Sequence, residues 1–390
     1  MISVTKLLFA RNYFGDSLRY TKTAHKMTSG AAEGVGPVVV WNSTRTCNLR
    51  CRHCYMDSDS RRYTDELSTV EAKKFIDDLA EFKVPVLLFS GGEPLMRADF
   101  FELAEYAANK NVRPTLSTNG TLITRAVAEK IKNIGVGYVG ISLDGLQDVN
   151  DKFRGVAGAY QKAMAGIENC VAVGQRVGLR FTINRHNFEE LDKIFDFIET
   201  EKINRVCFYH LVYSGRGSKM IDEDLTPAES RAAMDKIIER TKDFERRGLE
   251  KEILTVDNHC DGVYMYLKNL YEGNLETAAQ VQKFISMNGG NRSGIAFGEV
   301  DPAGYVHPDQ FTQHYTFGNV RERKFGDIWT DTTNEIMAGL KNRKPLLTGR
   351  CAKCKFLDNC NGNFRTRAEA KTGDFWESDP ACYLTDEEIF

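Results

Sequence analysis

Short apolar runs alternate with amphipathic stretches between residues 38 and 210. The apolar runs are rich in β-branched and aromatic residues and predict strands at 38–41, 84–89, 113–117, 138–142, 178–183 and 205–210. Apolar residues recurring every three or four positions predict helices between them, at 68–82, 99–109, 126–134, 159–172 and 188–201. Such alternation is typical of parallel strands joined by right-handed crossovers. We therefore expect an α/β fold, a partial (β/α)6 TIM-like barrel, with a doubly wound open sheet as the alternative.

Two segments carry strong helix-start signals. Ser68 with Glu71 three residues later forms a capping box, which marks the start of the first barrel helix. Thr226, Pro227 and Glu229 supply an N-cap, a first-turn proline and a first-turn acid. The second signal predicts a helix that runs to about residue 247.

The alternation ends after residue 210. Residues 249–290 are predicted to be helical and connecting, with a short amphipathic helix at 261–271. Two short strands are expected between residues 292 and 307, and short helices at 325–329 and 334–342. We divide the chain into an N-terminal extension (1–36), a barrel (37–248), and linker helices with a small cysteine-rich domain (249–390).

The charge balance excludes some classes of partner. The 390 residues include 52 Lys and Arg against 54 Asp and Glu, a formal net charge of −2. Broad nucleic-acid binding needs a basic excess that neutralises phosphates. No apolar run reaches the about 18 residues that suggest a membrane span, and the first residues lack a secretory cleavage site. We expect a cytoplasmic protein with no nucleic-acid partner and no membrane span.

The ten cysteines are the unusual part of the composition. Most of them form two sets along the chain, Cys47, Cys51 and Cys54 near the start and Cys351, Cys354, Cys360 and Cys382 near the end, while Cys170, Cys207 and Cys260 stand alone. Without an export signal, clustered cysteines are more often metal ligands than disulfides. Both sets are therefore candidate metal sites.

The first set has the spacing C-x3-C-x2-C directly after the first predicted strand. Three thiolates can hold three irons of a [4Fe-4S] cube and leave the fourth iron open for a small chelating ligand. A structural zinc ion would need a fourth protein ligand. His53 is the nearest candidate for that ligand, but it lies between two of the cysteines and is poorly placed to bind the same ion.

This cysteine loop and the loops after the next strands resemble the radical S-adenosylmethionine (SAM) superfamily. The resemblance implies that an open iron binds SAM, which is cleaved reductively to a 5′-deoxyadenosyl radical. It also implies that Gly91, Gly92, Glu93 and Pro94 hold the methionine amino group, that Ser117, Asn119, Ser142 and Asp144 lie around the ribose and methionyl group, that Arg154 pairs with the SAM carboxylate, and that His53 lies by the adenine.

The second set, C-x2-C-x5-C followed by Cys382, resembles the SPASM family of C-terminal extensions, which carry auxiliary [4Fe-4S] clusters. A full SPASM domain has another cysteine where this chain has Phe364, and a further cysteine near the position of Asp309. The resemblance therefore implies one auxiliary cluster held by Cys351, Cys354, Cys360 and Cys382. Zinc is the alternative ligand for this set, because C-x2-C pairs are common in zinc ribbons.

The chain is similar, nearly end to end, to radical SAM enzymes of the alternative haem and haem d1 pathways, which include a 12,18-didecarboxysirohaem deacetylase. The resemblance implies a tetrapyrrole substrate that loses acetate side chains, with propionate removal as the haem d1 variant. It also implies a low-potential electron donor of the flavodoxin or ferredoxin type.

A polycarboxylate tetrapyrrole needs an apolar slot with cationic anchors. Candidate residues around such a slot are Tyr209, Tyr213, Arg216, Lys219 and Arg292, and the candidates for catalysis or iron ligation are Tyr209, His210, His259 and His307. Two other functions stay open from the residues: a peptide-modifying SPASM enzyme, and a zinc-stabilised binding protein without catalysis.

Overall fold

The structure, a computed structural model, describes residues 1–390 and is built around one ten-stranded sheet. The strands are β1 (Ile2–Ser3), β2 (Val38–Thr44), β3 (Val86–Gly91), β4 (Arg113–Thr118), β5 (Val139–Ser142), β6 (Val177–Ile183), β7 (Arg205–His210), β8 (Glu252–Val256), β9 (Phe297–Val300) and β10 (Val306–His307). Their order across the sheet is β1-β8-β7-β6-β5-β4-β3-β2-β9-β10.

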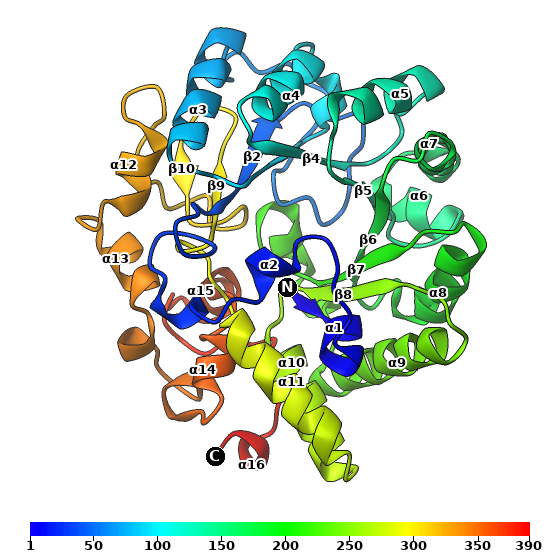
Figure 1. Cartoon of the computed structure of the whole chain (residues 1–390), viewed down its shortest axis with the longest axis vertical. Coiled ribbons are helices and arrows are strands. Elements are labelled where there is room, and N and C mark those ends of the chain that lie inside the picture. The colour runs from blue at the N-terminus through cyan, green and yellow to red at the C-terminus, as the bar shows by residue number, and fades with distance from the viewer.

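Helices cover the outside of the sheet, as Figure 1 shows. Those between the barrel strands are α3 (Thr69–Glu81), α4 (Phe100–Asn109), α5 (Arg125–Ile134), α6 (Asp148–Arg154), α7 (Ala159–Ala172) and α8 (Leu191–Thr200), followed by α9 (Pro227–Arg246). The N-terminal extension holds α1 (Val4–Phe9) and α2 (Asp16–Arg19). The C-terminal part holds α10 (Cys260–Tyr271), α11 (Leu275–Asn288), α12 (Phe325–Thr330), α13 (Glu335–Lys341), α14 (Leu357–Cys360), α15 (Arg365–Thr372) and α16 (Asp386–Ile389).

The strand order decides between the two expected architectures. From β2 to β8 each strand pairs in parallel with the next one along the chain, as in the register of Val39 opposite Leu87. A doubly wound sheet would reverse its strand order at a switch point. The order contains no reversal, so the partial barrel prediction is confirmed and the doubly wound alternative is wrong. The sheet stays open because β1 and β10, its two edge strands, do not pair with each other.

The prediction of a helical connection at 249–290 is wrong at its start. Residues Glu252–Val256 form β8, which pairs in parallel with β7 and antiparallel with β1. The physical reason is that all five residues of β8 are buried, so the segment lacks the polar face of a surface helix. The sheet therefore continues past residue 248. It continues at the other side too, where β9 pairs in parallel with β2.

Two smaller differences from the sequence prediction are local. The helix α6 was not expected, and the second barrel strand begins at Val86 rather than at residue 84 and extends to Gly91. Both predicted helix caps are confirmed. The Ser68 backbone N–H donates to Glu71 at 2.8 Å, and Thr226 and Glu229 form the same reciprocal pair.

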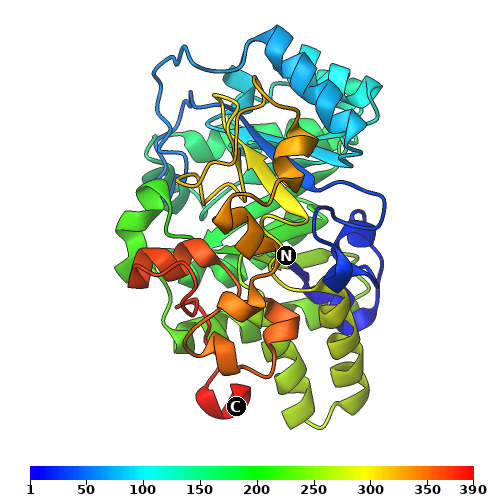
Figure 2. The same ribbon diagram turned by 90° about the vertical axis from the view of Figure 1, so that its left-hand side faces the viewer.

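The C-terminal part is packed onto the barrel. In Figure 2 its last helices, in orange and red, lie beside and below the barrel, with the N-terminal extension on the opposite side. On the β9 side the contact is close, because a Cβ on Gly298 would lie 2.5 Å from the Trp329 ring. Trp329 stacks on Phe325, and Phe325 packs edge-on against Phe75 of α3. Aromatic packing of this kind joins the two parts into one core.

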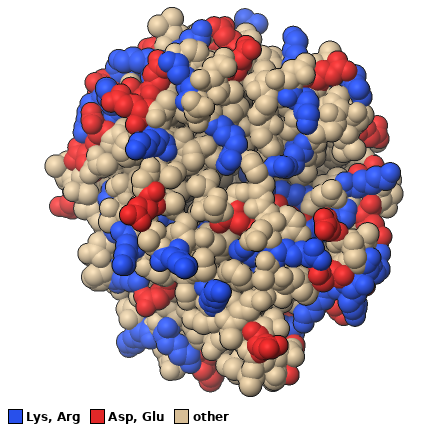
Figure 3. Space-filling view, viewed as in Figure 1, with Lys and Arg blue, Asp and Glu red and all other residues tan.

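The surface is mixed in charge. On the face drawn in Figure 3, Lys and Arg side chains are interspersed with Asp and Glu. None of the helices combines the length and apolar character that crossing a membrane requires.

A buried carboxyl group joins β9 to β2. The Asn42 side-chain amide donates to Glu299 at 2.6 Å, while the other Glu299 carboxyl oxygen has no hydrogen-bond partner. His307 and Asp301 lie on the same side of the sheet, within 4 Å of each other. Burial raises the pKa of Glu299 from 4.5 to about 8, so the carboxyl is protonated over most of the physiological range.

We expect Glu299→Gln to flatten the pH dependence of stability. A carboxyl whose pKa is raised on folding stabilises the protein below its unfolded pKa, and this contribution is lost as the pH rises through the folded pKa. The thermal midpoint of the wild-type protein should therefore fall between about pH 5.5 and about pH 8.5 by more than that of the variant. Circular dichroism melts measure this difference. The exposed Glu105→Gln serves as the control, and equal slopes in all three proteins would contradict the assignment.

Candidate active site

Cys47, Cys51 and Cys54 lie in one loop that leaves β2 and precedes α3. Neighbouring backbone fixes the shape of the loop: the N–H of Arg50 donates to the carbonyl of Arg154 at 3.1 Å, and that of Arg52 to the carbonyl of Phe153 at 3.0 Å. The loop is therefore anchored on α6, a helix from three β/α units further along the chain.

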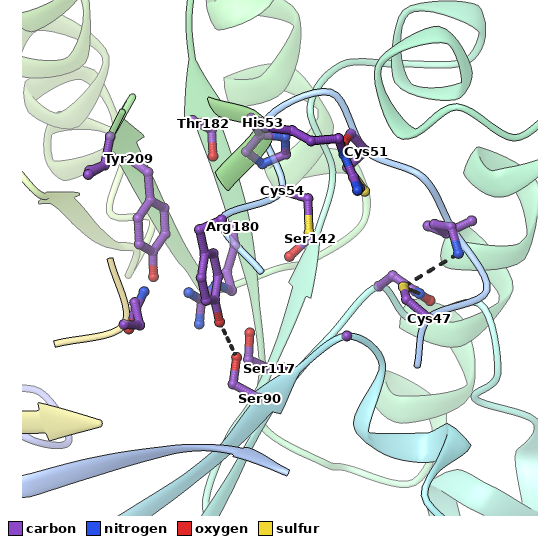
Figure 4. A pocket seen from close by; sticks show the side chains of 18 of the residues that line it. Cys47, Cys51, His53, Cys54, Ser90, Ser117, Ser142, Arg180, Thr182 and Tyr209 are labelled. Carbon is purple, nitrogen blue, oxygen red and sulfur yellow. Dashed lines mark hydrogen bonds between the residues drawn. The ribbon is translucent and has the colours of Figure 1, made fainter. Parts of the chain in front are cut away.

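The three cysteines line one cavity at the carboxyl ends of the barrel strands, where α/β folds place their ligands. The cavity also brings together most of the side chains that the sequence singled out: His53, Gly91, Gly92, Ser117, Asn119, Ser142, Arg154, Tyr209 and His210. Figure 4 shows the labelled cysteines, Ser142 and Ser117 around it. We call this cavity the cysteine lobe.

Burial favours the protonated form of two of these thiols, Cys47 and Cys51. Burial raises the pKa of Cys47 to about 12 and raises the pKa of Cys51 above its usual value. One cation offsets part of this effect, because the Arg154 guanidinium lies 3.5 Å from the Cys51 sulfur. A metal ligand must be a thiolate, so occupation of this loop by iron releases protons.

Two glycines let β2 and β3 approach each other closely. A Cβ on Gly91, whose φ is +116°, would lie 2.3 Å from the carbonyl oxygen of Thr44, and one on Gly92 would lie 2.3 Å from that of Thr46. Instead the Gly92 N–H donates to the Thr44 carbonyl at 2.7 Å. No other residue type fits this approach.

Glu93 and Pro94, which complete this motif, do not line the cavity. The Glu93 carboxylate is fully buried and accepts hydrogen bonds from the Thr118 hydroxyl and the Asn119 N–H, both at 2.8 Å. Burial raises its pKa to about 7. Glu93 therefore joins the loops after β3 and β4, and it fixes Asn119, whose side-chain amide reaches Asn48 in the cysteine loop at 2.8 Å.

A buried ion pair supports the opposite side of the cysteine lobe. Arg154 contacts Asp144 at 2.6 Å, and Asp144 itself is fully buried and lies behind the cavity wall. Arg154 lines the cavity, and its Nε has no hydrogen-bond partner. His53 packs on Phe153 at 4.8 Å between ring centres, and burial lowers its pKa to about 4, so its imidazole is neutral.

A second, larger cavity of about 1470 Å³, open to solvent, extends through the barrel interior toward the opposite ends of the strands. It is lined largely by apolar side chains together with the arginines Arg19, Arg113, Arg180, Arg205 and Arg292. We call it the lumen. The cysteine lobe and the lumen share five lining residues, Arg180, Tyr209, Asp257, Gln310 and Phe311, which form the junction between them.

The four candidate catalytic residues lie in four different places. Tyr209 lies at the junction and His210 lines the cysteine lobe, where its Nε2 contacts Asp261 at 2.9 Å. Burial disfavours the charged imidazole, but Asp261 raises the pKa of His210 above its usual value. His259 lines the lumen, and burial lowers its pKa. His307 lines neither cavity and is bonded to the carbonyl of Tyr315 at 2.9 Å.

The candidate residues for anchoring a tetrapyrrole do not lie together around one cavity. Arg216 borders the cysteine lobe, but it donates to the Cys51 carbonyl at 2.8 Å and to Asp57 at 2.7 Å, so it holds the cysteine loop. Lys219 is exposed and Tyr213 is hydrogen-bonded to Asp224, and neither lines the cysteine lobe or the lumen. Arg292 lines the lumen and donates to the carbonyls of Gly30 and Ala31.

Arg180 and Asp257 line the junction and were not singled out from the sequence. Arg180 is one of several arginines in strand positions, and Asp257 follows a strand that was itself not predicted. Their only sequence signal is a charge beside an apolar run. Burial raises the pKa of Asp257 to about 6.

The second cysteine set surrounds a separate small cavity in the C-terminal part. Cys351, Cys354, Cys360 and Cys382 line it, and so does Cys260 from the start of α10. A hydrogen bond from Cys260 lowers the pKa of Cys382, whereas burial raises that of Cys260 well above its usual value. Sequence reasoning did not assign this fifth thiol to the set, because Cys260 lies 91 residues before its nearest member.

Both thiol sets have the donor chemistry of an iron-sulfur cluster. Each set surrounds a cavity. Thiolate donors in threes and fours are the usual ligands of [4Fe-4S] clusters.

Comparison with known families defines the class of protein. The radical SAM superfamily profile matches residues 41–198, and a SPASM profile, described as an iron-sulfur cluster-binding domain, matches residues 297–355. The chain belongs to the radical SAM superfamily: it is an enzyme that uses SAM and [4Fe-4S] clusters.

Within that superfamily the chain resembles enzymes of haem biosynthesis. It is 56% identical to the Fe-coproporphyrin III synthase of Methanosarcina barkeri over 100% of this chain and 99% of the relative. It is 41% identical to the pre-heme d1 synthase of Dinoroseobacter shibae over 97% of this chain and 93% of the relative. The fold matches Streptococcus suis SuiB, in its complex with the precursor peptide SuiA, with a TM-score of 0.71, 18% identity, and coverage of 93% of this chain and 77% of that one.

We expect Gly92→Ala to disable the cysteine lobe. Its Cβ would collide with the carbonyls of Thr46 and Arg45, so the cysteine loop would have to move. Anoxic reconstitution should then yield markedly less iron per chain, measured by a colorimetric iron assay, and a lower thermal midpoint. Gly135→Ala is the control for iron loading alone: a Cβ there would meet nothing within 4 Å, although the φ of +82° strains any residue with a side chain. Equal iron loading in the two variants would refute the prediction.

Proposed function

We propose that the protein is a radical SAM enzyme of tetrapyrrole biosynthesis that removes acetate side chains from a didecarboxysirohaem-like substrate. The observation that carries the proposal is the full-length identity of 56% to an Fe-coproporphyrin III synthase, which exceeds that to a pre-heme d1 synthase by a wide margin. The lumen supports it, because an apolar cavity with several arginines suits a macrocycle that carries carboxylates.

In this proposal Cys47, Cys51 and Cys54 hold the SAM-binding cluster, and SAM lies in the cysteine lobe. When bound and reduced, the cluster with SAM would supply the chemistry of hydrogen-atom abstraction from the substrate. The chain positions the reactants and excludes water. Gly91 and Gly92, which line the cysteine lobe, would face the methionine end of SAM.

Charged and aromatic groups in the cysteine lobe would orient SAM. Arg154 would form an ion pair with the SAM carboxylate. Asp144 fixes one edge of its guanidinium, whereas its Nε has no hydrogen-bond partner in the protein. His53 is neutral and packed on Phe153, which suits a position beside the adenine ring. Ser117, Asn119 and Ser142 complete the polar wall around the ribose and the methionyl group.

The second thiol set would hold one auxiliary cluster through Cys351, Cys354, Cys360 and Cys382. Its cavity shares no lining residue with the lumen or with the cysteine lobe. A cluster enclosed in this way suits electron transfer better than substrate ligation. We propose a low-potential flavodoxin or ferredoxin as the electron source and the cytoplasm as the location.

We expect Cys382→Ala to lose roughly half of the about eight irons per chain, because one of two [4Fe-4S] clusters loses a ligand. Cys260→Ala should keep its iron, because Cys260 is a neighbour of this set and not a member. Iron and sulfide analysis of anoxically reconstituted protein measures both. Full iron content in Cys382→Ala would remove this residue from the ligand set, and loss in Cys260→Ala would add the fifth thiol to it.

We expect the wild-type enzyme to convert 12,18-didecarboxysirohaem to a product that lacks two acetate groups. The assay combines reconstituted enzyme, SAM and dithionite under anoxic conditions, with mass spectrometry of the tetrapyrrole and chromatography of 5′-deoxyadenosine. Cys54→Ala is the matched control, since loss of one cluster thiolate should abolish both products. Unchanged tetrapyrrole alongside turnover of a peptide would overturn the proposal, and loss of propionate-derived carbon would assign the haem d1 reaction instead.

A further inference from the structure

Arg180 is a half-buried cation without a partner in the protein. It lies on β6, and its guanidinium makes no hydrogen bond and no ion pair with any other residue. Its one specific contact is with the ring of Tyr209, 4.8 Å from the ring centre. Burying a charge without an opposite charge is costly. A cation held in this way is therefore prepared for an anion that the chain does not itself supply.

Neighbouring strands are shaped to accommodate this side chain. Gly140 of β5 pairs in register with Gly178 of β6. A Cβ on Gly140 would lie 2.8 Å from the Cδ of Arg180, and one on Gly178 would lie 2.3 Å from the Tyr138 hydroxyl. Glycine weakens a strand interior, so its presence at both positions marks the space given to Arg180 and Tyr138 in the barrel interior.

Three of the four other arginines of the lumen have polar partners in the protein, and the fourth, Arg113, lies away from the junction. Arg205 pairs with Glu252 at 3.3 Å, and Arg19 pairs with Glu252 at 2.7 Å. Arg292 donates to two backbone carbonyls of the N-terminal extension. Arg113 stacks over the ring of Phe14, 4.2 Å from its centre, at the end of the lumen away from the cysteines. Arg180 alone combines a lack of polar partners with a place at the junction.

The location of Arg180 sets what it can contact. It lines both the cysteine lobe and the lumen, and Figure 4 shows it beside Tyr209, across the cavity from Cys47. The nearest acid at the junction, Asp257, is not within 4.0 Å of its guanidinium nitrogens. A molecule in the lumen that reaches toward the cysteine lobe must pass this cation.

We propose that Arg180 binds a side-chain carboxylate of the tetrapyrrole at the junction, so that the macrocycle lies in the lumen and the reacting side chain faces the cysteine lobe. This inference rests on the proposed function. A guanidinium suits the role because it can donate two parallel hydrogen bonds to a carboxylate. Arg180 thereby fixes which edge of the macrocycle is presented to the site of radical formation.

The test is equilibrium binding of Fe(III)-coproporphyrin III to anoxically reconstituted protein, followed in the Soret band. Arg180→Gln should bind at least about tenfold more weakly than wild type, the effect of losing a charge-assisted pair. Arg180→Lys should recover part of the affinity, because lysine keeps the positive charge but cannot donate two parallel hydrogen bonds to a carboxylate. Arg246→Gln, at a side chain that is 73% exposed, should bind as wild type does.

The outcomes separate this inference from the proposed function. Iron content and thermal midpoint of Arg180→Gln should equal those of wild type, because its guanidinium contacts no polar group of the protein. A clear fall in midpoint would overturn the inference, since it would show a structural role. Equal porphyrin affinity in wild type and Arg180→Gln would overturn it while leaving the proposed function intact. No porphyrin binding by iron-loaded wild type would overturn both.

Discussion

The close approach of two backbones at the ends of β2 and β3 is the constraint on which the rest of the site depends. Gly91 and Gly92 lie against the carbonyls of Thr44 and Thr46 at distances that exclude any side chain. This contact directs the cysteine loop over the mouth of the barrel instead of away from it. Glu93 then extends the connection to the loop after β4 through the Thr118 hydroxyl and the Asn119 N–H. Three successive strand ends are thus locked together by hydrogen bonds that a ligand does not have to provide.

Buried charges have two different roles in this fold. Arg154 with Asp144, and Arg367 with Asp379, are paired at 2.6 and 2.7 Å. Each pair holds its arginine against a distant segment, because Arg154 contacts Cys51 and Arg367 donates to the carbonyl of Asp257. Breaking such a pair leaves an uncompensated charge in the interior, so these pairs fix geometry more than they add stability. Arg180 is different because its counter-charge is missing. The contrast between paired and unpaired buried cations separates residues that hold the site from one that faces a ligand.

The sequence alone was sufficient for elements with strong periodicity or clear caps, and for the grouping of the cysteines into two sets. The six barrel strands, the capped helices and both cysteine sets belong to this group, because their signals lie within a few residues of one another. It failed for β8, since a fully buried five-residue run has no periodicity that distinguishes it from a helical segment. It also missed Arg180 and Cys260. Their significance depends on the partners that they have or lack in space, and no local pattern records that.

The two thiol cavities are separate, yet one buried pair connects their surroundings. Asp379 accepts from Arg367, and its backbone carbonyl accepts from the N–H of Cys382 at 3.1 Å. Arg367 in turn donates to the carbonyl of Leu211, beside the cysteine lobe, and to that of Asp257 at the junction, at 3.2 and 2.6 Å. Asp257 is held there with a φ of +68°, which is unfavourable for a residue with a side chain. The same guanidinium therefore fixes the backbone next to Cys382 and the backbone that presents Asp257, so the position of the auxiliary thiols and the shape of the junction are set together.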